Sequence, residues 1–294
     1  MDSFTSSSER PRLAYVACLL AGLAACFAVQ SFLIRRTGGR TTKSESNYFS
    51  SIARLQSGIR GAPQVMFLGS SITGRLPDRS RGFNGVANLG CDGGSAMETL
   101  RAMDAGIIPR APYLIIEGNT FYRAVGAEET DVAKAMHKPW FRRGVALPNL
   151  SAAGRPSSMA YTLLMERKMG ASSPDIEPFP VITQPTLSPR PQPTSKAEDA
   201  LLEEAVGILR RLTTAGSKIT LIMFPPGAEP SSPNRRLPEE LARRAGLPFW
   251  DLANAVPPGM VRFTDGVHMD PPSATAAVRT IFKATGYPSA LSPE

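Results

Sequence analysis

The feature that most restricts this chain is an apolar segment near its N-terminus. No charged side chain occurs in the 22 residues from Leu13 to Ile34. A helix needs about 20 apolar residues to cross the ~30 Å core of a bilayer. We therefore expect an N-terminal tail at residues 1–12, a transmembrane helix at residues 13–34 and a juxtamembrane linker at residues 35–46. Residues 47–294 then form the folded domain.

Two alternatives to a transmembrane helix stay open. The apolar region of a cleaved signal peptide usually has about 7–15 residues, which is shorter than this segment. Leu23-Ala24-Ala25-Cys26 resembles the lipobox of a lipoprotein signal. The apolar run continues past Cys26 to Ile34, however, and a mature lipoprotein N-terminus rarely does so.

The charges that flank the apolar segment bear on the side of the membrane that the domain occupies. Two basic residues precede the segment, and four follow it: Arg35, Arg36, Arg40 and Lys43. Lys and Arg are enriched on the cytoplasmic side, so this count places the domain in the cytoplasm. The rule is weak for long domains, which translocate largely regardless of flanking charge.

Composition excludes several classes of function. The formal net charge is +8, of which residues 1–43 supply six basic and two acidic side chains. The remaining 27 basic and 23 acidic residues give the domain a net charge of +4. This charge by itself does not indicate nucleic-acid binding. Three Cys and two His, without a Cys-x-x-Cys pair, predict no metal centre. The sequence implies no organic cofactor.

The domain alternates short apolar runs with amphipathic segments. Strands are predicted at residues 64–68, 84–89, 113–116, 218–224 and 248–252, and helices at 48–57, 95–105, 196–215, 237–245 and 273–284. Such alternation indicates an α/β fold, with a parallel sheet of about five strands covered by helices on both faces.

Residues 120–195 separate the third and fourth predicted strands and contain no further strand. Residues 172–195 hold seven Pro, which favours extended or irregular chain. We expect a solvated excursion, with a flap over the site or a spacer as alternatives. Within it, the basic and aromatic residues 136–143, which include His137, form either an exposed loop or a contact with lipid head groups or an anionic glycan.

Polar residues that suit acyl transfer follow the predicted strands. Ligands of open parallel sheets bind beyond the carboxyl ends of the strands, where these residues would meet. Ser71 is the candidate nucleophile and needs a base, for which His268 is the better of two histidines. Asp265, three residues earlier, is placed to orient the imidazole. The N–H groups of Ser71 and Gly93 and the amide of Asn119 are candidate oxyanion donors.

Each of these residues has a structural alternative. Ser71 could cap the helix that follows the first strand, and Asn119 could be a turn residue. Asp265 and Gly266 could form a simple turn that leaves His268 on the surface. Cys91 is more consistent with a small packed residue than with a nucleophile.

Four segments together resemble the conserved blocks of the SGNH (GDSL-like) hydrolase superfamily, in the same order. They read FLGSSIT, NLGCDGGS, EGN and DGVH. The resemblance covers about residues 64–285, less residues 125–195, and implies a three-layer flavodoxin-like domain. It implies Ser71 as nucleophile, Asp265 and His268 as orienter and base, and an oxyanion hole of Ser71, Gly93 and Asn119.

The chain departs from the family pattern at two points, and the glycine of the second block has two candidates. Ser70 stands in place of the Asp of Gly-Asp-Ser, but that Asp is not a member of the triad. Gly90 is an alternative to Gly93 in the second block. Asn119 precedes Thr120 rather than the common Asp. A Gly-Ser-Ser block resembles membrane-linked members that act on acyl or alanyl esters of envelope polymers.

These observations predict a membrane-anchored, serine-dependent esterase or O-acyltransferase. Its expected partners are the membrane and an acylated glycan or other ester substrate, such as an envelope polysaccharide, and this substrate is our reason to expect an extracytoplasmic domain. One alternative is a non-catalytic SGNH-like scaffold that assists a membrane acyltransferase. Another is a flavodoxin-like FMN binder, because Ser71-Ile72-Thr73-Gly74 is similar to its phosphate loop.

Overall fold

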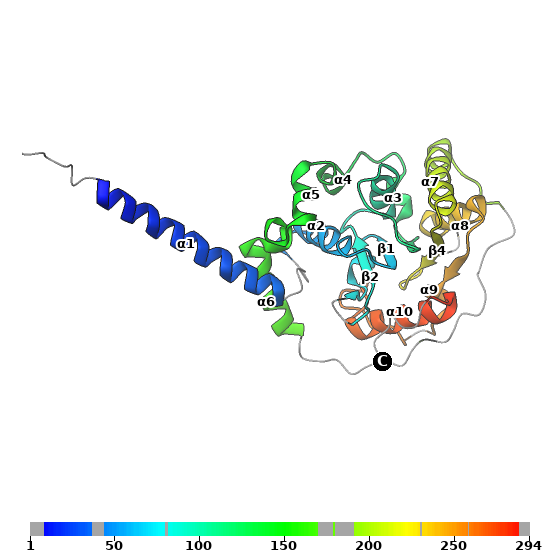
Figure 1. Ribbon diagram of the computed structural model, residues 1–294. Helices are drawn as coiled ribbons and strands as arrows, with labels where there is room; N and C mark the ends of the chain where they lie inside the picture. The colour runs from blue at the N-terminus through cyan, green and yellow to red at the C-terminus, as the bar shows by residue number, and fades with distance from the viewer. Residues whose placement is uncertain are drawn as a thin grey trace, which may run out of the picture.

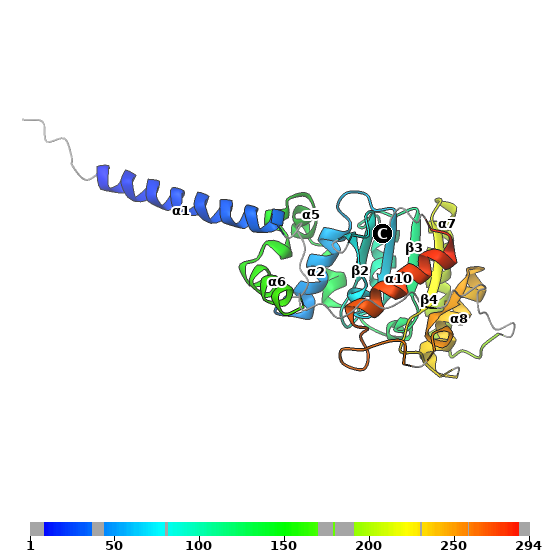
Figure 2. The ribbon, with the colours of Figure 1, turned by 90° about the horizontal axis from the view of Figure 1, so that it is seen from below.

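The structure is a computed structural model, shown in Figure 1 and, from below, in Figure 2. It describes residues 9–36, 44–79, 82–169, 179, 191–229, 231–257 and 259–287. Most of the predicted tail, residues 37–43 of the predicted linker and most of the Pro-rich segment at 172–195 lie outside the described residues.

The sheet has five strands, all parallel, as the sequence predicts. They are β1 (Val65–Gly69), β2 (Val86–Gly90), β3 (Tyr113–Glu117), β4 (Lys218–Met223) and β5 (Phe249–Asp251). The order across the sheet is β2-β1-β3-β4-β5, which is the flavodoxin-like order. Almost every strand residue is buried, since both faces of the sheet are covered.

Alternate residues of each strand enter two separate cores. In β1, Met66 and Leu68 belong to one core, whereas Val65 and Phe67 belong to the other. The first core holds α2 (Asn47–Gly58), α3 (Ala96–Asp104), α7 (Lys196–Thr214) and α8 (Pro233–Ala245). The second is covered mainly by α10 (Pro271–Thr285), on the other face of the sheet in Figure 1. This arrangement gives the predicted three layers.

Local sequence signals define where the covering helices begin. Ser95 and Glu98 form a capping box at the start of α3, and Ser195 and Glu198 form another at the start of α7. Each box satisfies backbone N–H groups that have no partner within the helix. Helix α10 begins with Asp270 as its N-cap, followed by Pro residues in the first turn.

The expectation of a solvated excursion is wrong for the first part of residues 120–195. This part forms η3 (Phe121–Ala124), α4 (Asp131–Met136), α5 (Pro139–Ala146), η4 (Pro148–Leu150), η5 (Ala152–Gly154) and α6 (Pro156–Met169). Phe121, Met136, Phe141 and Ala153 are buried in the first core. Helices α4 and α5 are too short for a clear apolar period, and packing on α2 stabilises them together with η5.

The basic and aromatic segment at residues 136–143 is not a loop. It contains the end of α4, the residue His137 at its C-cap and the beginning of α5. Met136 and Phe141 point into the core, whereas Lys138, Trp140, Arg142 and Arg143 stay exposed.

Helix α1 (Glu9–Arg36) extends away from the domain in both views (Figures 1 and 2). Its residues Arg12–Arg36 are long and apolar enough to cross a membrane, and no other helix among the described residues is. The helix is longer than the predicted span at residues 13–34, because the flanking residues 9–12 and 35–36 are helical as well. Only its last turns contact the domain, against η4, η5 and α6.

Candidate active site

The candidate site lies where the chain changes direction across the sheet. Strand β1 is paired with β2 on one side and β3 on the other, and the chain leaves β1 and β3 toward opposite edges. Such a switch point is where ligands of doubly wound sheets bind. Ser71 follows β1, immediately before the short helix η1 (Thr73–Arg75), and Asn119 follows β3.

Ser71, His268 and Asp265 form a continuous hydrogen-bonded chain. Ser71 Oγ lies 2.8 Å from His268 Nε2, and His268 Nδ1 lies 2.6 Å from Asp265 Oδ2. When Nδ1–H donates to the carboxylate, Nε2 is left as an acceptor for the serine hydroxyl. The structure therefore brings together the three side chains that the sequence predicts as nucleophile, base and orienter, in the geometry that proton transfer from the serine requires.

Asp265 also organises the loop that carries the histidine. Its Oδ1 accepts the backbone N–H of His268 at 2.8 Å and that of Val267 at 3.1 Å. The loop is closed by a bridge between Phe263 and Met269 and by a bond from Thr264 N–H to the His268 carbonyl. One carboxylate thus fixes both the backbone and the ring of His268.

These bonds lower the pKa of Asp265 to about 2, the backbone N–H of His268 contributing most and its imidazole next. Hydrogen bonds to the ionised form of a carboxylate favour that form. Asp265 is therefore negatively charged at neutral pH, as an orienter of an imidazolium must be. Its side chain is 54% exposed, whereas that of His268 is 16% exposed, so the triad lies at the surface with its ring partly covered.

Two backbone N–H groups are free at the site. Neither the N–H of Ser71 nor that of Gly93 has a hydrogen-bond partner among the described residues. Gly93 has φ +83°, a conformation that glycine adopts without strain, and a Cβ there would meet open space. A free N–H beside open space suits a donor to a substrate oxygen.

Gly90, the alternative in the second block, is placed differently. Its N–H donates to Asn88 Oδ1 at 3.0 Å. A Cβ at Gly90 would lie 2.4 Å from the backbone nitrogen of Gly74 and 2.5 Å from the Ser70 carbonyl oxygen. Glycine is required here because the turn after β1 packs directly on the end of β2. These contacts favour Gly93 over Gly90 as the donor.

Asn119 makes contacts that the sequence does not predict. Its Nδ2 donates to the carbonyls of Phe224 at 2.7 Å and Pro226 at 3.2 Å, and its Oδ1 accepts the N–H of Phe224 at 2.8 Å. The amide therefore joins the end of β3 to the chain that leaves β4. A role of Asn119 in an oxyanion hole stays a prediction, and it requires the longer bond to Pro226 to be exchanged for substrate.

Glu117, the last residue of β3, is a site residue whose role the sequence does not reveal. Its fully buried carboxylate accepts the backbone N–H groups of Ser70 and Thr73 at 2.8 and 3.1 Å. The hydroxyls of Ser70, Thr73 and Thr120 donate to it as well, at 2.7–3.0 Å. We call this group the Glu117 cluster.

The Glu117 cluster holds the backbone on both sides of Ser71. A buried carboxylate is stable only when it is well supplied with donors, and this one has five groups donating to it. The sequence feature that could have pointed to this cluster is the glutamate at the end of the otherwise apolar strand YLIIE.

A buried ion pair fixes the segment that contains Gly93. Arg54 of α2 contacts Asp92 at 3.1 Å and also donates to the carbonyl of Gly90. Cys91, between them, is buried, and burial raises the pKa of its thiol. A protonated, inaccessible thiol is a poor nucleophile, which favours the interpretation of Cys91 as a packed residue.

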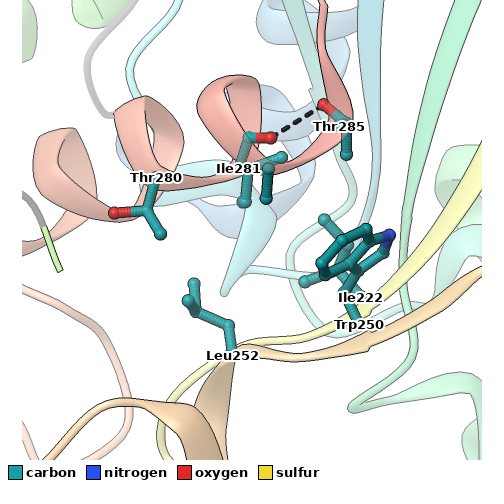
Figure 3. Close-up of a pocket in the computed structure, with 7 residues that line it drawn as sticks. Ile222, Trp250, Leu252, Thr280, Ile281 and Thr285 are labelled. Atoms are coloured by element: carbon teal, nitrogen blue, oxygen red, sulfur yellow. Dashed lines mark hydrogen bonds between the residues drawn. The ribbon is translucent and has the colours of Figure 1, made fainter. Parts of the chain in front are cut away.

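A pocket of about 260 Å³ adjoins Gly93. Its walls come from α2, from the segment after β2 and from the start of α4: Tyr48, Cys91, Asp92, Gly93, Gly94, Thr130, Asp131 and Val132. The cavity in Figure 3 is a different one, of about 10 Å³, between α10 and the strands β4 and β5. Its lining is mainly apolar, with Ile222, Trp250 and Leu252 facing Ile281, so it is a packing gap of the core.

The part of the chain that the structure describes holds no group of three or more His, Cys, Asp and Glu placed to bind a metal ion. Comparisons of this chain with protein-family models, with curated proteins and with solved structures found no match. The fold is thus defined by its strand order, and the site by its own geometry.

Proposed function

We propose that this chain is a serine-dependent ester hydrolase or O-acyltransferase. The observation that carries the proposal is the hydrogen-bonded chain from Ser71 through His268 to Asp265 at the carboxyl edge of the sheet. The two free N–H groups of Ser71 and Gly93 support it, since acyl transfer needs donors for the oxyanion that develops on the carbonyl.

In the first half-reaction, Ser71 Oγ attacks the ester carbonyl and His268 Nε2 takes the hydroxyl proton. Asp265 stabilises the imidazolium that results, while backbone N–H groups bind the oxyanion. The C–O bond to the alcohol then breaks, and His268 returns the proton to the leaving oxygen. The product is an acyl ester of Ser71.

In the second half-reaction, His268 removes a proton from an incoming hydroxyl group. That group attacks the acyl-serine, and the serine oxygen leaves with the proton that His268 held. If the hydroxyl belongs to water, the reaction is hydrolysis. If it belongs to a sugar, the acyl group is transferred.

We further propose that the substrate is an acylated polysaccharide of the cell envelope and that the domain lies outside the cytoplasm. A membrane anchor keeps an enzyme beside a large substrate that does not diffuse to it. The four basic residues after the apolar segment favour the opposite topology, but this rule is weak for long domains.

The two alternative functions, an FMN binder and a non-catalytic scaffold, require different features of the site. An FMN phosphate in the turn after β1 would need its backbone N–H groups, and those of Ser70 and Thr73 already bind the carboxylate of Glu117. A scaffold that assists a separate acyltransferase would not need an activated serine.

The test uses the full-length protein in detergent micelles with a fluorophosphonate probe, which traps an activated serine whether or not the acceptor is present. Ser71 Oγ forms a bond to phosphorus, and fluoride leaves. We expect labelling of the wild type, none of Ser71→Ala, and normal labelling of Ser231→Ala, which changes an exposed serine before α8. Hydrolysis of p-nitrophenyl acetate is measured in parallel.

The outcomes separate the proposals. Labelling with no hydrolysis supports a transferase that excludes water. Labelling of Ser71→Ala equal to that of the wild type shows that Ser71 is not the nucleophile. Absence of labelling in the folded wild type contradicts the catalytic proposal and favours a scaffold.

A further inference from the structure

Exposed apolar side chains are concentrated on one part of the domain. Outside α1, the large apolar side chains that the structure shows as exposed are Trp140, Leu147, Leu150, Tyr161, Leu163, Leu164 and Val267. All but Val267 lie in the continuous stretch from α5 through η4 to α6. We call these six residues the apolar collar, because η4 and α6 contact the base of α1.

The segment that carries the collar is joined to α1 by hydrogen bonds from residues next to the collar. Gln30 Nε2 donates to the carbonyls of Asn149 and Gly154, both at 2.9 Å. Asn149 Nδ2 donates to Ser31 Oγ at 2.6 Å. Gln30 and Ser31 are polar residues inside the otherwise apolar segment, and these bonds satisfy them.

The position of these bonds along α1 sets the depth of the collar. Gln30 is four residues before Ile34, the end of the uncharged segment. At 1.5 Å per residue, it lies about 6 Å inside that end along the helix axis. Asn149 and Gly154 are held at the same level, so η4, with Leu150, is placed at the boundary of the bilayer if α1 spans it.

The chemistry of the collar suits this boundary. Trp and Tyr are enriched where membranes meet water, because one end of each ring is apolar and the other polar. Residues 138–165 contain four basic and no acidic side chains. Lys138, Arg142 and Arg143 are exposed, whereas Arg155 pairs with Glu45 at 2.6 Å. Basic groups next to an apolar surface are attracted to anionic lipid head groups.

We propose that the apolar collar, and Leu150 and Leu164 in particular, inserts into the head-group region of a membrane with anionic lipids, beside the point where α1 leaves it. The partner is lipid rather than protein because the collar is continuous with α1 and lies at the depth of its end. The proposal rests on α1 spanning the bilayer and is independent of the ester chemistry.

The test places one fluorescent bimane label at a time on the full-length protein in vesicles of phosphatidylcholine and phosphatidylglycerol. The background carries Cys18→Ala and Cys26→Ala and retains Cys91, which is buried. Leu150→Cys and Leu164→Cys report on the collar. Leu20→Cys reports on α1, and Glu203→Cys reports on α7 at the far end of the domain (Figure 1).

We expect lipids with a doxyl group near the head group to reduce bimane fluorescence at Leu150→Cys and Leu164→Cys, and lipids with a doxyl group deep in the acyl chain to reduce it at Leu20→Cys. Neither lipid should change the fluorescence at Glu203→Cys. Quenching at Leu20→Cys without quenching at the collar overturns the proposal. Absence of quenching at Leu20→Cys overturns it too, because α1 is then outside the bilayer. Collar labels that are unquenched in vesicles but cross-link to a protein in native membranes assign the surface to a protein partner instead.

Discussion

Ser71 and His268 are separated by 197 positions in the sequence, yet Ser71 Oγ lies 2.8 Å from His268 Nε2. The contact follows from how α10 is placed. Phe282 of α10 stacks on Phe67 of β1 with ring centroids 6.3 Å apart, which fixes the helix over β1. The loop that precedes α10 therefore meets the turn that follows β1.

We expect Asp265→Asn to lower kcat by about three to four orders of magnitude. Asparagine keeps the size of the side chain but favours the imidazole tautomer with its proton on Nε2, which then cannot accept the serine proton. The measurement is kcat for p-nitrophenyl acetate, with the fold checked by circular dichroism. Activity near that of the wild type contradicts the role of Asp265 as orienter.

The lowered pKa of Asp265 predicts an acid-dependent contribution to stability. The pKa is about 2 in the folded chain and about 3.9 in unfolded chains, so the folded state favours the ionised form. The contribution is complete above about pH 4 and is lost as the pH falls toward 2. The carboxyl ¹³C shift of Asp265, followed by NMR from pH 1 to pH 6, measures this pKa.

The control for this titration is His268→Ala, which removes the ring but keeps the backbone N–H of residue 268. We expect the pKa of Asp265 to rise only part of the way to its ordinary value, because the largest contribution comes from that N–H. A pKa that returns fully to the ordinary value contradicts the contacts described for Asp265 Oδ1.

Gly93→Ala tests the second oxyanion donor against a matched control. Gly93 and Gly106 both have positive φ, of 83° and 68°, and a Cβ at either would meet nothing within 4 Å. Alanine at each position strains the backbone by about 1–2 kcal/mol, so the loss of stability should be similar. Only Gly93→Ala should move a donor, and we expect its kcat to fall about 10- to 100-fold.

The comparison of the two variants decides the assignment. If the kcat values of Gly93→Ala and Gly106→Ala are equal, Gly93 does not contact the reacting carbonyl.

Asn119→Ala separates a bracing role from a catalytic one. The N–H and carbonyl of Phe224 lose their partner, which should reduce the free energy of unfolding by about 1–3 kcal/mol. If the amide also donates to the oxyanion, kcat of the folded variant falls by about 10²–10³. We expect both effects. Unfolding in urea gives the first, and single-turnover acylation well below the melting temperature gives the second.

A stable Asn119→Ala variant with unchanged kcat would remove Asn119 from the oxyanion hole. The hole would then consist of backbone groups alone.

Glu117→Gln tests the Glu117 cluster. The N–H groups of Ser70 and Thr73 both donate to Oε2, whose place the amide oxygen can take. The amide nitrogen then stands in place of Oε1, so the hydroxyls of Ser70 and Thr120 lose an acceptor. We expect a fall of about 1–3 kcal/mol in the free energy of unfolding. We also expect kcat to fall with KM unchanged, because Ser71 loses its fixed position without loss of substrate contacts.

Glu203→Gln, on the exposed face of α7, is the matched control and should change neither value. A Glu117→Gln variant that loses stability but keeps its kcat shows that the cluster supports the fold and does not position Ser71.

The periodicity of the sequence was enough to predict the sheet and its covering helices. Strands such as QVMFL and YLIIE are short and apolar and end next to glycine, and the long helix at 196–214 has a clear apolar face and a capping box. The helices α4 and α5 escaped prediction because they have only six and eight residues. Their burial depends on α2, a contact between distant segments that no local pattern records.

For the site, residue type and order predicted the three side chains that form the hydrogen-bonded chain, but not the residues that hold them in place. Ser71, Asp265 and His268 each belong to a recognisable short segment. Arg54 contacts the segment of Gly93 from a helix 38 residues away, and Asn119 binds a carbonyl 105 residues away. Such pairings are set by the packing of the sheet and its helices.

The Glu117 cluster accounts for a serine, rather than an aspartate, at the position before Ser71. Ser70 Oγ is a donor to the Glu117 carboxylate at 2.8 Å. An aspartate at position 70 would replace this donor by a second carboxylate held against the buried one, and like charges at such a short distance repel each other. Serine at 70 and glutamate at 117 are therefore a matched pair, and an aspartate at position 70 would fit only if Glu117 were replaced as well.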